Sequence, residues 1–209
     1  MIEPTPILLF LDKDPEVSAR YLTNYFLDRS IKYACQVLLC STYYLLGFRN
    51  KTVFKYYFNK DRWDDTKFKY FPKYPLKTIP KFAFYNSEES RWCRKCSDHY
   101  RYVCKYLGYM LSEYEFRMNK EHKLVEMYPF LLKHQMELAL SRGVRPVKLK
   151  DKSKFQLPWK NLPRKYRKKD IIKGYRLYYS SLVFSPVEAF IGTKREVPDF
   201  LWSKVESIV

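Results

Sequence analysis

The sequence predicts a mainly α protein, a single compact helical domain with a short N-terminal strand and a long irregular insertion rich in aromatic residues and lysine. Its 209 residues fall within the range of one domain, and a hydrophobic content of 46% is enough for a core. Apolar residues recur at helical spacing in several long segments. We therefore expect one domain over residues 1–209.

The N-terminal third predicts a strand followed by two helices. The apolar run 7–11 indicates a short buried strand. Asp14 can cap a helix over residues 15–27 that has Pro15 in its first turn. Asp28 or Ser30 can cap a second helix, over residues 31–46. Its apolar stripe predicts a central core helix and consists of Ile31, Ala34, Cys35, Leu38, Leu39, Thr42, Leu45 and Leu46.

The middle of the chain begins with an irregular segment. Residues 48–86 alternate lysine with phenylalanine or tyrosine, contain three prolines and lack helical periodicity, so we expect a partly extended insertion. Ser87 and the acids after it indicate the start of the longest helix, over residues 88–119. A further helix, residues 121–142, should be interrupted near Pro129.

The C-terminal third predicts a basic loop and two short helices. Residues 145–169 form the loop, which contains three prolines. Asp170 can cap a helix over residues 171–184, and residues 198–208 should add a final helical turn or two.

The charge of the chain indicates a polyanionic partner. A formal net charge of +18 and a pI near 9.6 exceed what solubility requires, and nucleic acid is the commonest such partner. A lysine-rich proteome or burial in a large assembly would explain the same charge. No secretion signal opens the chain and no apolar stretch reaches the length of a membrane span, so we expect an intracellular protein that does not contact a membrane.

The cysteines do not predict a disulfide framework or a metal site. There are five of them, an odd number, within segments of helical pattern. Cys93, Cys96 and Cys104 fall on one stripe of a single predicted helix, with His99 between them. Ligands on one stripe point in the same direction and cannot surround a tetrahedral zinc ion. We expect small buried hydrophobic residues, and neither a metal nor a cofactor.

The segment Glu113 to His122 is the strongest candidate for chemistry. Glu113, Arg117 and Lys120 lie four and three residues apart and so share one face of the predicted helix. An acid and two bases on one face can grip a phosphate while the carboxylate orients a proton or a sugar. The alternative is an ordinary solvated ladder of salt bridges. The candidate catalytic residues are Glu113, Lys120 and His122.

A second candidate site is the cationic cluster Leu162 to Asp170, followed by Gly174 to Tyr179. Five cations within six residues, with tyrosines interleaved, suit phosphate contacts supported by stacking on bases or sugars. A solvated charged loop with its tyrosines in the core would explain the pattern equally well. The candidate nucleic-acid contacts are Arg94, Arg117, Lys165, Arg167, Tyr175, Arg176, Tyr179, Lys194 and Arg195.

Several short motifs occur together in a fixed order along the chain. They are residues 10–20, Asp28-Arg-Ser-Ile-Lys32, Trp92 with Arg94, Glu113 to His122, Leu-Pro-x-x-Tyr at 162–166, Tyr175-Arg-x-Tyr-Tyr179 and Lys194-Arg-x-x-Pro198. With these motifs the chain resembles a family of bacteriophage and large-DNA-virus proteins that is itself distantly similar to pyrimidine-dimer DNA glycosylases of the endonuclease V type. The resemblance implies a helical DNA-binding scaffold of viral origin, located in the host cytoplasm or nucleus or in the virion.

Departures from that family's pattern favour binding without catalysis. Ser30 stands where the family has histidine, and Gln36 or Val37 stands where the helix should carry glutamate. A neutral amide cannot act as a carboxylate base. We therefore expect a DNA-binding protein on a glycosylase-like scaffold. The alternatives are a non-enzymatic structural component of a larger viral or nucleoprotein complex, and an active base-modifying or base-excising enzyme.

Overall fold

The computed structural model describes residues 8–45, 86–95, 97–129, 131–132, 157–158, 160–183 and 185–202. Within these ranges the protein is mainly helical and contains no strand, which confirms the predicted fold class except for the strand. The predicted insertion 48–86, except for Asn86, lies outside the described residues. So do half of the predicted helix 121–142 (residues 130 and 133–142), residues 145–156 of the basic loop and residues 203–208.

The chain divides into two compact units. Unit 1 comprises residues 1–34, 105–125 and 156–209, and unit 2 comprises residues 35–104 and 126–155. Two long helices, α2 (Asn24–Leu45) and α5 (Ser97–Met118), each begin in one unit and end in the other. The expectation of a single domain over residues 1–209 stays a prediction.

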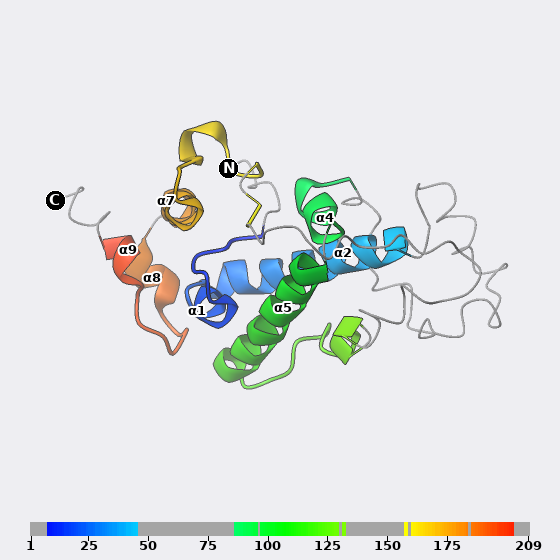
Figure 1. The fold of residues 1–209 in the computed structure, drawn as a ribbon. Coiled ribbons are helices and arrows are strands. Elements are labelled where there is room, and N and C mark those ends of the chain that lie inside the picture. The colour runs from blue at the N-terminus through cyan, green and yellow to red at the C-terminus, as the bar shows by residue number, and fades with distance from the viewer. Residues whose placement is uncertain are drawn as a thin grey trace. The chain divides into compact units, whose positions relative to one another are not determined.

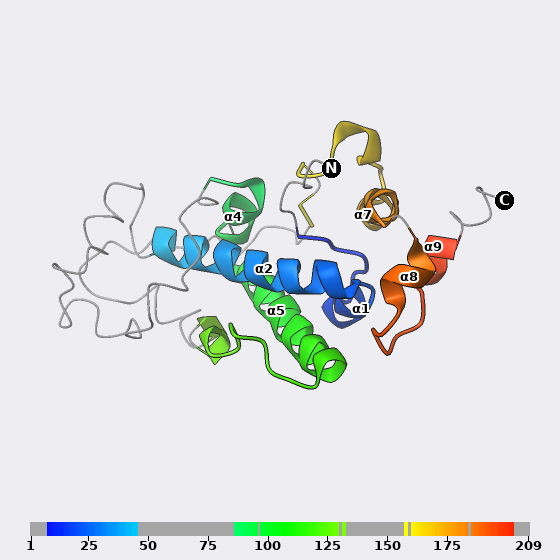
Figure 2. The same cartoon turned by 180° about the vertical axis from the view of Figure 1, so that it is seen from behind.

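Unit 1 contains the other helices of the N- and C-terminal parts of the chain (Figure 1; Figure 2). They are α1 (Pro15–Arg20), the 3-10 helix η3 (Arg164–Tyr166), α7 (Ile171–Leu182), α8 (Pro186–Phe190) and α9 (Asp199–Trp202). Helix α7 packs against both η3 and α9. Unit 2 contains α4 (Glu88–Cys93) and a short helical stretch at residues 127–129 and 131–132.

Helix caps predicted from the sequence are present. The side chain of Asp14 accepts a hydrogen bond from Glu16 N and caps α1, with Pro15 in the first turn. Ser87 caps α4 through Ser90 N, and Asp170 caps α7 through Lys173 N. Each cap joins residues two or three positions apart, so the local sequence determines it.

The helix boundaries between these caps differ from the prediction at two places. Helix α1 ends at Arg20, and α2 begins at Asn24 with the Thr23 hydroxyl 3.4 Å from Phe26 N, so the break does not fall at Asp28 or Ser30. The predicted helix 88–119 is two helices, because α4 ends at Cys93 and α5 begins at Ser97. In both cases the apolar periodicity continues across the break, so the sequence pattern gives no sign of the helix boundary.

The predicted N-terminal strand is not a strand, although its residues are buried as expected. Leu8 to Leu11 are 0–1% exposed. Side chains take the place of a partner strand, because the Ser18 hydroxyl accepts from Leu11 N at 2.8 Å and the Tyr106 hydroxyl donates to Leu9 O at 2.6 Å. Side chains therefore satisfy backbone groups of Leu9 and Leu11 that a neighbouring strand would otherwise bond.

Aromatic rings form the core of unit 1 around Phe10. Its ring centroid lies 5.8 Å from that of Tyr106 and 5.4 Å from that of Tyr175, the latter edge to face. Tyr179 packs edge to face against Phe26 at 5.2 Å. These ring pairs tie α7 to residues near the N-terminus.

The core of unit 2 confirms the predicted stripe of the central helix. Cys35, Leu38, Leu39 and Thr42 are all at most 2% exposed. The Thr42 and Tyr100 hydroxyls form a hydrogen bond of 3.0 Å. None of the described helices is both long enough and apolar enough to span a bilayer.

Candidate nucleic-acid interface

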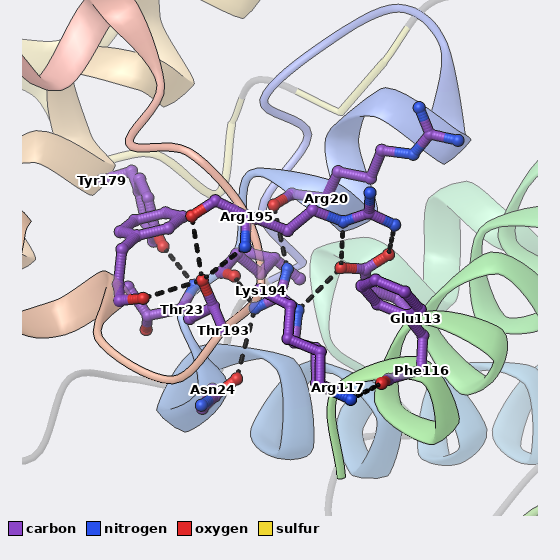
Figure 3. A network of polar contacts seen from close by, with 12 residues as sticks. Arg20, Thr23, Asn24, Glu113, Phe116, Arg117, Tyr179, Thr193, Lys194 and Arg195 are labelled. Carbon is purple, nitrogen blue, oxygen red and sulfur yellow. Dashed lines mark hydrogen bonds and ion pairs between the residues drawn. The ribbon is translucent and has the colours of Figure 1, made fainter. Parts of the chain in front are cut away.

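Glu113 is the centre of a buried ion-pair network in unit 1 (Figure 3). Its side chain is 5% exposed. Arg117 Nε donates to Oε1 at 2.7 Å, and Arg195 donates through Nε to Oε1 at 2.9 Å and through Nη2 to Oε2 at 2.8 Å. One carboxylate therefore holds two guanidinium groups, one of them in a bidentate pair.

Arg117 is a buried residue that stabilises the fold rather than a surface cation. Its side chain is fully buried. Nη1 donates to Leu22 O at 2.6 Å and to Asn24 Oδ1 at 3.3 Å, and Nη2 donates to Arg20 O at 2.9 Å. Both terminal nitrogens are thus engaged with the break between α1 and α2. The structure therefore gives no support to the expectation that Arg117 contacts nucleic acid.

The same network fixes the protonation state of Glu113. Burial alone would raise the pKa of this carboxyl, but the hydrogen bonds and charges of Arg195 and Arg117 outweigh burial and hold the pKa below its usual value. A carboxylate with a lowered pKa and both oxygens occupied is a weak proton acceptor. The geometry thus supports the salt-bridge alternative for the Glu113 motif, here in buried form.

His122 is also committed to structural contacts. Its side chain is 1% exposed. Leu124 N donates to Nδ1 at 3.1 Å, so the proton of the neutral ring lies on Nε2, which donates to Asp28 Oδ1 at 3.3 Å. Burial lowers the pKa of His122, and Asp28 opposes this only in part. With both nitrogens occupied, a catalytic role for His122 is not supported.

Lys120 does not join Glu113, and the candidate contact residue Arg176 binds other groups. Helix α5 ends at Met118 and Asn119 has a φ of 51°, so Lys120 leaves the helical face predicted for it and is exposed. Arg176 donates through Nε to Leu11 O at 2.7 Å and through Nη2 to Asp12 Oδ2 at 2.8 Å. The expected cluster is therefore reduced to Glu113 and Arg117, and Arg195 takes the place that the sequence assigned to Lys120.

Tyr175 and Tyr179 belong to the core, which does not support the expectation that they stack on bases. Both are fully buried. The Tyr175 hydroxyl donates to Pro158 O, and the Tyr179 hydroxyl accepts from Thr23 N at 2.7 Å. Of the two interpretations of this cluster, the one with its tyrosines in the core describes these residues.

The cations that precede α7 are, in contrast, exposed. Residues 160–173, here called the basic turn, carry seven lysines and arginines and one carboxylate, that of Asp170. All seven cations are exposed, and they are Lys160, Arg164, Lys165, Arg167, Lys168, Lys169 and Lys173. A surface with this excess of positive charge attracts the phosphates of a nucleic acid electrostatically, whatever the base sequence.

Two features hold the basic turn in a defined shape. Arg167 donates through Nε to Leu162 O at 2.7 Å and through Nη2 to Lys160 O at 2.6 Å. Gly174 lets η3 approach α7, because a Cβ built on it would lie 2.5 Å from Tyr166 O. Arg167 therefore organises the turn through its own guanidinium, whereas the expected contact residue Lys165 lies over the Tyr166 ring at 4.8 Å.

The remaining expected contacts lie apart from the basic turn in the sequence. Lys194 and Arg195 follow α8, and both flank the ring of Phe116 in the last turn of α5. Arg94 lies directly after α4 in unit 2 and is partly exposed. Phe116 lies inside the Glu113 motif, but the sequence did not indicate that its ring would be exposed, because an apolar residue in a helix is expected to be buried.

The cysteines agree with the interpretation as buried hydrophobic residues. Cys35, Cys40, Cys93 and Cys104 are buried, and burial raises the pKa of Cys35 to about 12. Cys96 lies outside the described residues. Among the described residues, no three histidine, cysteine or acidic side chains are placed to bind a metal ion. Two nearby acids also have structural partners: Asp12 forms an ion pair with Arg176, and Asp14 caps α1.

Comparison of the chain with family models, with curated proteins and with solved structures gives no match.

Proposed function

We propose that this protein binds DNA through the basic turn and performs no chemistry at Glu113. The observation that carries the proposal is the exposure of seven cations against one carboxylate in residues 160–173. Such a segment contacts phosphates and positions a protein on nucleic acid without reading base sequence. The net charge of +18 gives the same expectation for the whole chain.

The order of the basic turn supports binding more strongly than charge alone. Arg167 and Gly174 fix the backbone that carries the other cations. Cations on a preformed turn lose less conformational freedom on binding than cations on a flexible tail. The motif resemblance to viral proteins of the glycosylase-like type points to the same class of ligand, with binding retained and base excision lost.

The proposal predicts an affinity that depends steeply on salt. For duplex DNA, each phosphate contact contributes about 0.9 to the slope of log K against log salt concentration. Substituting Lys165, Lys168 and Lys169 together by glutamine should weaken binding and flatten that slope by about two to three. Fluorescence anisotropy with labelled DNA at several salt concentrations measures both quantities.

A matched control removes the same charge elsewhere. Arg91, Lys95 and Arg101 are exposed cations of unit 2, and their combined substitution by glutamine changes the net charge equally. The proposal requires a smaller loss of affinity for this variant. Equal losses in the two variants, or an affinity that does not change with salt, would rule out the basic turn as the interface.

A further inference from the structure

The ring of Phe116 is a partly exposed aromatic surface with two cations close to it. It is 45% exposed in the last turn of α5. Arg195 Cζ lies 4.4 Å from the ring centroid and Lys194 Nζ lies 5.3 Å from it. Leaving so much of an apolar ring in water is unfavourable, and the two cations cover part of it by cation-π contact.

Both cations are held in place, yet each keeps a donor for another group. The two bonds from Arg195 to Glu113 use Nε and Nη2, and within the described part of the chain no bond occupies the hydrogens of Nη1. Lys194 Nζ donates to Phe116 O at 2.8 Å (Figure 3). It also donates to Asn119 Oδ1 at 2.9 Å, and an ammonium group has three hydrogens. The remaining donors suit an anionic oxygen beside the ring.

The backbone conformations of Lys194 and Asn119 are unusual, as expected where surrounding contacts hold the chain in a fixed geometry. Lys194 has a φ of 57° and Asn119 a φ of 51°, both in the left-handed region that residues other than glycine seldom adopt. Such conformations persist where the surrounding contacts over-determine them. Here the Lys194 side chain bonds to the end of α5, and the Arg195 side chain bonds to Glu113.

We propose that Phe116, Lys194 and Arg195 form a platform for one unpaired nucleobase and its phosphate, so that single-stranded DNA is the preferred ligand. The inference rests on the proposed function and names the form of nucleic acid that the protein prefers. Inside a duplex both faces of a base are covered by its neighbours, whereas an unpaired base offers a face to an aromatic ring. The ring receives the base, and the two cations receive the phosphate.

Charge alone predicts the opposite preference. Duplex DNA has a higher density of phosphates than a single strand, so a purely electrostatic surface binds the duplex at least as tightly. A preference for the single strand therefore reports stacking and not charge. Comparing single-strand with duplex affinity therefore distinguishes the contribution of the platform from that of the basic turn.

The test compares the full-length protein on one labelled oligonucleotide, single-stranded and annealed to its complement, by fluorescence anisotropy. We expect tighter binding to the single strand. Phe116→Leu should weaken single-strand binding about tenfold and leave duplex binding nearly unchanged, because one stacked base is lost. Phe116→Trp, which keeps an aromatic face, should retain the single-strand affinity.

Tyr109→Leu provides the matched control. Tyr109 is 38% exposed in the same helix and shares a face with Phe116, but no cation-π contact involves its ring in the described residues. This variant should bind single strands like the parent protein. Equal affinity for the two forms of DNA, or equal losses in the two leucine variants, overturns the platform while salt-dependent binding keeps the proposed function. Absence of binding to either form at low salt overturns both.

Discussion

The basic turn and the Glu113 network contain the same types of residue in opposite environments. In the network, the Arg117 side chain is fully buried and the Glu113 carboxylate accepts hydrogen bonds from both Arg117 and Arg195. The basic turn contains seven exposed cations and a single carboxylate. A buried cation must be neutralised by an acid, whereas an exposed cation is stabilised by water and remains accessible to a ligand. Burial and the number of nearby acids, rather than residue type, distinguish the structural cations from the cations that we propose bind DNA.

The largest effect expected from this comparison is the loss of the Glu113 charge. Glu113→Gln leaves Arg117 as a buried charge without its counterion, so the free energy of unfolding should fall by about 3 kcal/mol. Urea denaturation measures it. Glu115→Gln removes a charge from the exposed face of the same helix and should change stability by less than about 0.5 kcal/mol. Similar values for the two variants would mean that the network does not stabilise the fold.

The next effect concerns the shape of the basic turn. Gly174→Ala places a methyl group against Tyr166 O, a backbone atom that cannot rotate away, so η3 must move from α7. We expect a loss of about 2 kcal/mol and faster tryptic cleavage within residues 160–173. Ser181→Ala, on the exposed side of the same helix, is the control. Unchanged cleavage in Gly174→Ala would show that the turn does not depend on this close approach.

A smaller effect follows from the pH dependence of the buried groups. The pKa values of His122 and Glu113 are both lowered on folding. For each, the stabilisation is complete above the pKa of the unfolded chain and is lost as the pH falls below it, first for histidine near 6.5 and then for glutamate near 4.5. His99, whose pKa is also lowered, contributes in the same direction.

Urea denaturation at several pH values between 7.5 and 5 tests the histidine part of this prediction. The stability of the parent protein should fall over this range, and that of His122→Gln should fall less steeply because one of the two described histidines is removed. A steeper fall in the variant would contradict the assignment of a neutral buried ring to His122.

The smallest effect on stability is expected for the exposed cations. Replacement of Lys165, Lys168 and Lys169 by glutamine should change the free energy of unfolding by less than about 0.5 kcal/mol, because these side chains are solvated in the folded protein. The same variant should lose DNA affinity. A large loss of stability would place these lysines in the structural class to which Arg117 belongs.

The features that the sequence predicted well depend on neighbouring residues. Asp14, Ser87 and Asp170 cap helices through backbone groups two or three residues away, and the stripe from Ile31 to Thr42 is buried. In each case a few adjacent positions carry the whole signal.

The features that the sequence did not predict depend on contacts between distant residues. Arg117 Nη1 donates to Leu22 O across 95 positions, and Tyr179 accepts from Thr23 N across 156. No local pattern shows that an arginine will occupy the break between α1 and α2, or that a tyrosine in a cationic segment will be buried. The resemblance to DNA-binding viral proteins stays a prediction that the binding experiments test.

The buried segment Leu8 to Leu11 has a consequence for self-association. Apolar extended segments with open backbone groups offer an edge on which another chain can add a strand. Here Leu9 O, Leu11 N and Leu11 O are already bonded to Tyr106, Ser18 and Arg176. Side-chain bonds therefore protect the most hydrophobic stretch of this end of the chain from intermolecular strand pairing, and the loss of Ser18 or Tyr106 would expose it to aggregation.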